Sequence, residues 1–276
     1  MNLEEVQLIA TDMDNTLLTS NHELPPKFDE MLQNLLQLKV EFVIATGRPF
    51  YTLEKMFANY LNEISFVSDN GGVITYKGQV LFQSLIARKD YSTMVSFVTQ
   101  NTSGVCILSG AKAAYISEKD RQYKEHLHNF YSNIEVVENL QQLDIEVAKF
   151  STFFPNEDSK AYFNELFKPR FSEQFSVSTS DTCWIDIMNK NVNKGNAVKS
   201  LGEELGISND NMMAFGDAFN DKEMLQKVAY SFVVANADPE LAAYAKYKTL
   251  SNDQYGVKKV IEQVILAKEG AAKVSK

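Results

Sequence analysis

Short apolar runs alternate with segments of helical periodicity at both ends of the chain. The uninterrupted run at 6–11 is typical of a buried strand, and a segment from Pro26 then carries apolar residues at helical spacing. Strands that alternate with helices of this length pair in parallel through right-handed crossovers. The two ends together predict one doubly wound, Rossmann-like α/β domain. Its expected strands are 6–11, 40–46, 64–68, 212–215 and 231–234, and its expected helices are 26–38, 49–61, 196–205, 221–228 and 257–267.

The middle of the chain has a different texture. It begins after a predicted hairpin around Lys77-Gly78, and its strands follow one another around a few helices, which indicates an α+β unit with a mainly antiparallel sheet. We expect strands at 105–108, 113–116, 148–154, 175–179 and 183–188 and helices at 89–100, 119–131 and 159–167. The predicted organisation is a discontinuous core domain, residues 1–82 and 189–276, interrupted by an inserted domain at 83–188. The tail 268–276, rich in Ala, Gly and Lys, is expected to fray.

Composition excludes several classes of protein. The 276 residues are 45% hydrophobic and 23% charged, as in an ordinary globular protein. A formal charge of −9 argues against a nucleic-acid partner, because no Lys/Arg run is present to displace phosphate counterions. No apolar segment has the length to span a bilayer, and residues 1–5 are acidic where a signal peptide is basic. We therefore expect a cytoplasmic protein without a membrane or evident protein partner, with Cys106 and Cys183 as two buried thiols.

Two carboxylates, Asp12 and Asp14, follow the first predicted strand. A buried parallel strand usually delivers its functional groups just past its carboxyl end. Two like charges there repel each other unless a cation or a shared proton compensates. Taken alone, the segment can also be a strand-end turn capped by Asp14 and Asn15.

Two further polar clusters begin predicted helices. In Thr46-Gly47-Arg48, the glycine permits close backbone approach and Pro49 suits a first helical turn, so N–H groups and a hydroxyl would face one point. Lys194 also begins a helix, where a cation opposes the helix dipole and asks for an anionic partner. Judged separately, the first cluster can be a simple helix cap and Lys194 a solvated surface lysine.

A fourth cluster, Gly216 to Asp221, adds two carboxylates and the amide of Asn220 after another strand. Alone it can be a Gly-Asp turn. Four such clusters at the ends of one predicted sheet together meet the needs of metal-assisted phosphoryl transfer. Clustered carboxylates bind Mg²⁺, and a metal, a lysine and N–H groups can stabilise the equatorial phosphoryl oxygens. One carboxylate can attack phosphorus and another can act as acid and then base.

With these motifs, the chain resembles the haloacid-dehalogenase-superfamily phosphatases of the Cof-type branch, which carry a large inserted cap of the C2B type between the second and third motifs. The match spans Asp12 to Asp221, and residues 236–238 and 255–257 resemble the branch's closing segment. One departure is Asn15, where the family usually has Gly; Asn tolerates left-handed backbone conformations, so the turn can survive. The resemblance implies Mg²⁺-dependent hydrolysis of small phosphomonoesters, such as sugar or polyol phosphates, FMN, pyridoxal phosphate or a riboflavin-pathway intermediate.

The resemblance also implies roles for individual residues. Asp12 would be the nucleophile, forming an aspartyl-phosphate, and also a Mg²⁺ ligand. Asp14 would protonate the leaving oxygen, then activate water, and would bind the metal through its backbone carbonyl. Asp217 would be a side-chain ligand of Mg²⁺ supported by Asp221. The residues expected at the phosphoryl group are Thr46, Lys194, Asn220 and the N–H groups of Gly47 and Met13, with Arg48 and Asn70 at the entrance.

The cap sequence does not name a substrate. Its candidate polar contacts are Tyr115, Lys119, Arg121, Tyr123, His126 and His128, each of which can equally be an ordinary surface or core residue. Two other readings remain open. A phosphomutase of the same superfamily would need several cap cations for a second phosphate, and a non-catalytic phosphosugar-binding protein would have lost a catalytic group.

Overall fold

The computed structural model describes residues 1–156, 159–180 and 182–274. The two ends of the chain build an eight-stranded sheet with the order β14-β13-β12-β1-β2-β3-β4-β5. Its strands are β1 (Leu8–Thr11), β2 (Glu41–Ala45), β3 (Ser65–Ser68), β4 (Val73–Tyr76), β5 (Gln79–Gln83), β12 (Met212–Gly216), β13 (Tyr230–Val233) and β14 (Tyr247–Lys248). All neighbours pair in parallel except the β3-β4-β5 edge, which is antiparallel.

Helices cover both faces of this core sheet. They are α1 (Phe28–Gln37), α2 (Phe50–Met56), α7 (Lys194–Glu204), α8 (Lys222–Lys227) and α9 (Gly256–Val274). Successive residues of a strand point to opposite faces. Ile9 of β1 accordingly packs with α1, α2 and α9, whereas Leu8 and Ala10 pack with α7 and α8. Two hydrophobic cores, one on either side of this mainly parallel sheet, make the doubly wound architecture that the sequence predicts.

The middle of the chain forms a second sheet, with the order β10-β11-β9-β6-β7-β8. Its strands are β6 (Val105–Gly110), β7 (Ala114–Ser117), β8 (Ile134–Val137), β9 (Val147–Phe153), β10 (Phe175–Ser180) and β11 (Trp184–Asn189). Only β7 and β8 pair in parallel within the described part of this sheet. Its helices are α3 (Arg88–Asn101), α4 (Lys124–Leu127), α5 (Ser159–Tyr162) and α6 (Lys168–Phe171).

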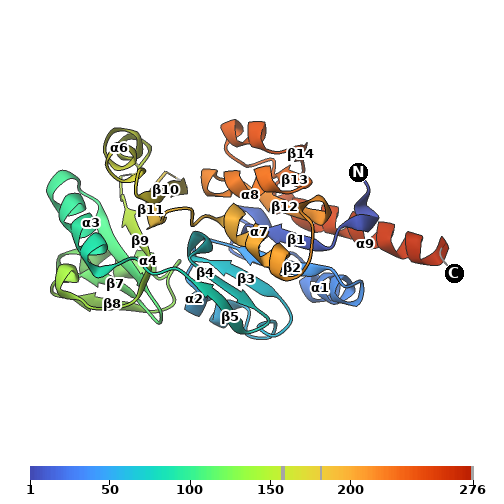
Figure 1. Cartoon of the computed structure of the whole chain (residues 1–276), viewed down its shortest axis with the longest axis horizontal. Coiled ribbons are helices and arrows are strands. Elements are labelled where there is room, and N and C mark those ends of the chain that lie inside the picture. The colour runs from blue at the N-terminus through green and yellow to red at the C-terminus, as the bar shows by residue number, and fades with distance from the viewer. Residues whose placement is uncertain (157–158, 181, 275–276) are drawn as a thin grey trace.

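The second sheet lies beside the carboxyl end of the core sheet, and both termini lie at the opposite end of the molecule (Figure 1). This arrangement confirms the predicted fold class, an α/β core with an inserted α+β unit, which we call the cap. The exact boundaries between core and cap, at 82/83 and 188/189, remain a prediction. Each falls one residue before the end of a strand, β5 and β11 respectively. Among residues 1–156, 159–180 and 182–274, no helix is both long and apolar enough to cross a membrane.

Two predicted elements are wrong. The helix expected at 119–131 is a 3₁₀ helix at Glu118–Tyr123 followed by the single turn of α4, because this stretch buries few side chains and lacks a sustained apolar stripe. The tail expected to fray from residue 268 instead continues α9 to Val274, since Ala, Lys and Glu are strong helix formers. Residues 275 and 276 lie outside the described residues.

Candidate active site

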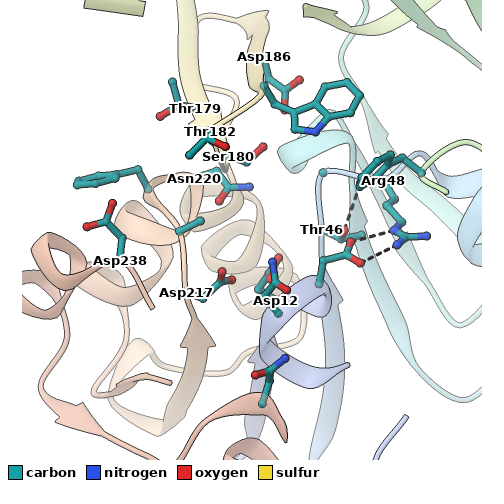
Figure 2. A pocket seen from close by; sticks show the side chains of 18 of the residues that line it. Asp12, Thr46, Arg48, Thr179, Ser180, Thr182, Asp186, Asp217, Asn220 and Asp238 are labelled. Atoms are coloured by element: carbon teal, nitrogen blue, oxygen red, sulfur yellow. Dashed lines mark hydrogen bonds and ion pairs between the residues drawn. The ribbon is translucent and has the colours of Figure 1, made fainter. Parts of the chain in front are cut away.

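The central position of β1 determines where the site lies. β1 pairs in parallel with β12 on one side and β2 on the other, and Thr11 is in register with both Phe215 and Ile44. The segments that follow these three strands therefore emerge side by side at one edge of the sheet. Asp12, Thr46 and Asp217 all lie there, as Figure 2 shows.

Lys194 joins the first and last motifs. Its Nζ donates to Oδ1 of Asp12 at 2.5 Å and to Oδ1 of Asp221 at 2.6 Å, and all three side chains are buried. Burial works to lower the pKa of Lys194, but the charges of Asp12 and Asp221 outweigh it and raise the pKa above its ordinary value. The lysine therefore stays an ammonium, although it occupies the first residue of a helix.

The local sequence explains how Lys194 reaches this position. Asn193 caps α7, its Oδ1 accepting a hydrogen bond from the Asn196 N–H at 2.8 Å. Gly195 lies against α8 so closely that a Cβ there would be 2.3 Å from the carbonyl carbon of Glu223. Glycine at 195 thus lets the start of α7 approach the segment that carries Asp221.

Carboxylates outnumber cations in this cluster. One ligand oxygen each from Asp12, Asp217 and Asp221 lie within 4.8 Å of one another. Burial and the charge of Asp221 raise the pKa of Asp12 to about 7 in spite of Lys194. Burial and the charges of Asp12 and Asp221 also raise the pKa of Asp217 well above its ordinary value. Three carboxylates, two buried and one half-buried, against one ammonium leave an excess of negative charge that suits a divalent cation.

The three carboxylates are not equally available to a metal. Both oxygens of Asp221 accept hydrogen bonds, Oδ1 from Lys194 and Oδ2 from the Asp217 N–H at 3.0 Å. Oδ1 of Asp217 accepts only from the Thr16 hydroxyl, at 2.8 Å, among the described contacts. Asp12 and Asp217 are thus the better ligands, and Asp221 holds the lysine and the Asp217 backbone.

Asp14 is turned toward Arg48. Two hydrogen bonds, Nε to Oδ2 at 2.9 Å and Nη2 to Oδ1 at 2.6 Å, join the two side chains. Burial works to raise the pKa of Asp14, but hydrogen bonds from His22 and Arg48 and the Arg48 charge hold it below its ordinary value. The turn itself is possible because Asn15 adopts the left-handed conformation (φ 57°), with its carbonyl accepting from Asn236 at 2.8 Å.

The remaining predicted residues surround the same point. The Thr46 hydroxyl accepts from the Arg48 N–H at 3.1 Å, and Gly47 follows it in the turn between β2 and α2. Met13 has its side chain buried in the core, so only its backbone can serve the site. Asn220 Nδ2 donates to Asn70 Oδ1 at 3.1 Å, which joins the fourth motif to the segment after β3.

Comparison with known proteins agrees with this geometry. The sequence model of the haloacid dehalogenase-like hydrolase family matches residues 9–261. The chain belongs to the haloacid dehalogenase-like hydrolases. It is 31% identical to the 5-amino-6-(5-phospho-D-ribitylamino)uracil phosphatase YbjI of Escherichia coli over 265 residues, which cover 94% of this chain and 96% of the relative. The predicted family resemblance and the enzyme class, a phosphatase, are confirmed.

Solved structures of the family share the whole fold. SMU.1108c of Streptococcus mutans superimposes with a TM-score of 0.89 at 30% identity, covering 95% of this chain and 99% of that one. BT4131, described as a sugar phosphatase of subclass IIB, superimposes with a TM-score of 0.78 at 20% identity, covering 94% of this chain and 98% of the other. Cap and core are therefore both features of this family.

In this hydrolase, the motif residues open onto a cavity of about 630 Å³ between core and cap. The core contributes Asp12, Asp14, Thr46, Gly47, Arg48, Asp217 and Asn220, and the cap contributes Phe130, Tyr131, Lys149, Lys160, Thr179, Ser180, Thr182, Trp184 and Asp186. In Figure 2, Asp186 and the hydroxyl residues 179, 180 and 182 lie across the cavity from Asp12 and Asp217. The cap thus forms the wall that faces the motif residues of the core.

The cap residues expected from the sequence are not in this wall. Tyr115, Lys119, Arg121, Tyr123, His126 and His128 are all absent from the cavity lining within the described residues. His126 stacks on Phe153, Tyr123 meets the same ring edge-on, and Arg121 pairs with Glu118 on the surface. The sequence analysis missed Lys149 and Asp186, charged residues in the middle of otherwise uncharged strands, which was the available signal.

Proposed function

We propose that this protein is a Mg²⁺-dependent phosphatase that hydrolyses small phosphomonoesters through an aspartyl-phosphate on Asp12. The observation that carries the proposal is the Lys194 ammonium bridging Asp12 and Asp221, together with a cavity, large enough for a metabolite, that Asp12 and Asp217 line. Lys194 engages Oδ1 of Asp12, and Oδ2 accepts no hydrogen bond among the described contacts. That second oxygen is available to attack phosphorus.

The chemistry divides between the two aspartates of the first motif. Asp12 attacks phosphorus as the bond to the leaving oxygen breaks, and Asp14 supplies the proton that this oxygen needs. Asp14 then takes a proton from the water that attacks the aspartyl-phosphate, which releases phosphate and restores Asp12. The pair with Arg48 must open for the first step, since a carboxylate held in an ion pair carries no proton to give.

Asp12 and Asp217 fit Mg²⁺ as side-chain ligands, with the Asp14 carbonyl as the third protein oxygen and Asp221 in support. The bound ion would neutralise the excess carboxylate charge and stabilise the phosphoryl oxygens as charge shifts in the transition state. Lys194 would oppose the same charge through its contact with Asp12 Oδ1. Thr46, the Gly47 and Met13 N–H groups and Asn220 are the expected contacts of the remaining phosphoryl oxygens.

The cavity wall supports hydrolysis rather than transfer to a second phosphate site. Its basic side chains within the described residues are Arg48, Lys149 and Lys160, and each pairs with a carboxylate: Asp14, Asp186 and Glu240 respectively. No uncompensated cluster of cations is therefore present in that described wall to hold the second phosphate that a mutase needs.

The wall also indicates the kind of leaving group. Trp184, Phe130 and Tyr131 offer ring surface, and Thr179, Ser180 and Thr182 offer hydroxyls. This combination suits leaving groups with hydroxyls or a ring, as in sugar and polyol phosphates, FMN or pyridoxal phosphate. The Escherichia coli relative is named for a phosphate ester of a ribityl chain on uracil, so that compound belongs in the substrate panel.

Hydrolysis of p-nitrophenyl phosphate with Mg²⁺ and with EDTA tests the class of activity, and a phosphometabolite panel ranked by kcat/KM tests the substrate. Activity with Mg²⁺ that EDTA abolishes supports the proposal. Inactivity under both conditions with retained phosphate-ester binding would favour a binding protein. Activity that requires a bisphosphate primer would favour a mutase.

A further inference from the structure

The core-facing side of the cap sheet carries a buried polar layer. Lys149 and Ser151 lie two residues apart on β9, so they share one face. Asp186 of β11 is in register with Ser151, and Ser109 of β6 is in register with Lys149. The opposite face of the same strands is apolar and includes Phe150, within the cap core. All four polar side chains are buried.

This layer bonds directly to the motifs of the core. Lys149 Nζ donates to the Gly47 carbonyl at 2.7 Å. Asn70 Nδ2 donates to Asp186 Oδ2 at 2.7 Å. The Lys149 ammonium also lies 3.4 Å from Asp186 Oδ2, and the Ser151 hydroxyl donates to Oδ1 at 2.5 Å. Adjacent cap strands therefore hold the segments that follow β2 and β3.

A buried cation at the Gly47 carbonyl can influence the Thr46 hydroxyl through a single peptide unit. This carbonyl belongs to the peptide unit whose N–H is that of Arg48, and this N–H donates to the Thr46 hydroxyl oxygen at 3.1 Å. A charge at one end of a peptide strengthens the hydrogen bond made at its other end. Because the Thr46 oxygen accepts that bond, the Thr46 hydroxyl proton is directed elsewhere, and it can donate to a phosphoryl oxygen.

Lys149 keeps its charge in this position. Burial works to lower its pKa, but the charges of Asp186 and Asp69 outweigh burial and raise the pKa above its ordinary value. Asp186 in turn balances the ammonium. The pair therefore orients a neighbouring peptide without adding net charge to the cavity.

We propose that Lys149, held by Asp186, is a positioning residue for the phosphoryl-binding turn. It fixes the Gly47–Arg48 peptide and through it the Thr46 hydroxyl, so the cap completes the phosphoryl site as well as covering it. This inference rests on the proposed function of Thr46. Because the phosphoryl group is common to all substrates, Lys149 acts on every ester alike, whatever its leaving group.

The test is a double variant, Lys149→Met with Asp186→Asn, which avoids leaving a buried carboxylate unpaired. Lys112→Met, an exposed cap lysine, is the matched control. Values of kcat/KM are measured for p-nitrophenyl phosphate, glycerol phosphate and glucose 6-phosphate, and orthovanadate affinity is measured by competition or calorimetry. We expect a loss of about 10- to 100-fold in kcat/KM, by one common factor for all three esters. Vanadate affinity should fall by a comparable factor, and Lys149→Arg should restore part of both.

A loss that differs between esters would overturn the inference, since it would make Lys149 a leaving-group contact. Unchanged kcat/KM and vanadate affinity with a lower melting temperature would also overturn it, as a purely structural role. Should the double variant fail to fold, Lys149→Gln with Asp186→Asn keeps an amide donor, and its smaller loss must again be common to all esters. Wild-type protein that hydrolyses neither p-nitrophenyl phosphate nor any ester of the phosphometabolite panel would refute the proposed function itself, whereas an active wild type with an unaffected variant refutes the role of Lys149 alone.

Discussion

Arg48 holds Asp14 through both carboxylate oxygens, while Asp12, two residues earlier, is held by Lys194. Two neighbouring carboxylates thus have different cationic partners and different environments. Burial raises the pKa of Asp12, whereas the Arg48 and His22 contacts lower that of Asp14. Their proposed roles can be separated by substitution.

Asp14→Asn should reveal the acid and base roles through the leaving group. Nitrophenolate departs without a proton, so p-nitrophenyl phosphate should still phosphorylate Asp12, but water is no longer activated. We expect a burst of one p-nitrophenol per site followed by slow turnover, and a fall of about 10²- to 10⁴-fold in kcat/KM for glycerol phosphate. Rapid-quench measurements check this. Equal losses for both esters without a burst would remove Asp14 from the acid role.

Asp12→Asn should abolish turnover and leave the fold intact. The amide oxygen can still accept from Lys194, but it cannot attack phosphorus, so kcat should fall by at least about a thousandfold. Hydrolysis assays and thermal unfolding check both statements. Asp210→Asn, the same change at an exposed site before β12, is the control. Substantial hydrolysis by pure Asp12→Asn protein would contradict the nucleophile assignment.

Mg²⁺ should stabilise the protein through Asp217. A ligand that binds only the folded state at a hundred times its Kd adds about 2.7 kcal/mol to the free energy of unfolding. We therefore expect Mg²⁺ to raise the Tm of wild type, and Asp217→Asn to lose that increase together with activity. Without metal, Asp217→Asn should be at least as stable as wild type, because it removes one of three clustered carboxylates that repel one another. A Tm increase that survives in this variant would place the metal elsewhere.

Asp69 should make stability depend on pH at the junction of cap and core. Its Oδ1 accepts from the Ser109 hydroxyl at 2.7 Å, and burial raises its pKa to about 6. A carboxyl whose pKa is raised on folding binds its proton more tightly in the folded state. Proton binding therefore adds to the free energy of unfolding at low pH, and this stabilisation is lost as pH rises through about 4 to 6. Asp69→Asn removes the dependence. The free energy of unfolding of Asp69→Asn minus that of wild type should therefore be about 1 to 2 kcal/mol larger at pH 7.5 than at pH 5. Urea unfolding at the two pH values measures the change, and a pH-independent difference would contradict it.

The core site could be predicted from the sequence because each of its motifs directly follows a recognisable strand or begins a recognisable helix. Asp12, Thr46 and Asp217 follow three apolar strands, and parallel pairing brings such strand ends together. Lys194 was identifiable as a cation at an unfavourable helix position. Asp221 was predicted as metal support, and its hydrogen bonds add the role of holding Lys194 and the Asp217 backbone, which only the folded loop reveals.

The cap wall could not be read in the same way. Its contacts depend on which face of an antiparallel sheet docks on the core, and that docking is a tertiary relationship between distant segments. Lys149 and Asp186 are 37 residues apart and meet Gly47 and Asn70 only after both sheets form. The charged and aromatic residues at 115–128 attracted notice by composition, but they belong to the cap's own packing and surface.

The cavity is built from two sources, and this has an evolutionary consequence. The proposed catalytic groups come from loops of the core sheet, whereas Thr179, Thr182 and Trp184 come from one neighbouring pair of cap strands and the segment between them. Point changes in that pair can alter which ester is accepted while the reaction itself stays intact. Substrate range can therefore evolve in the cap while the residues of the core keep the same reaction.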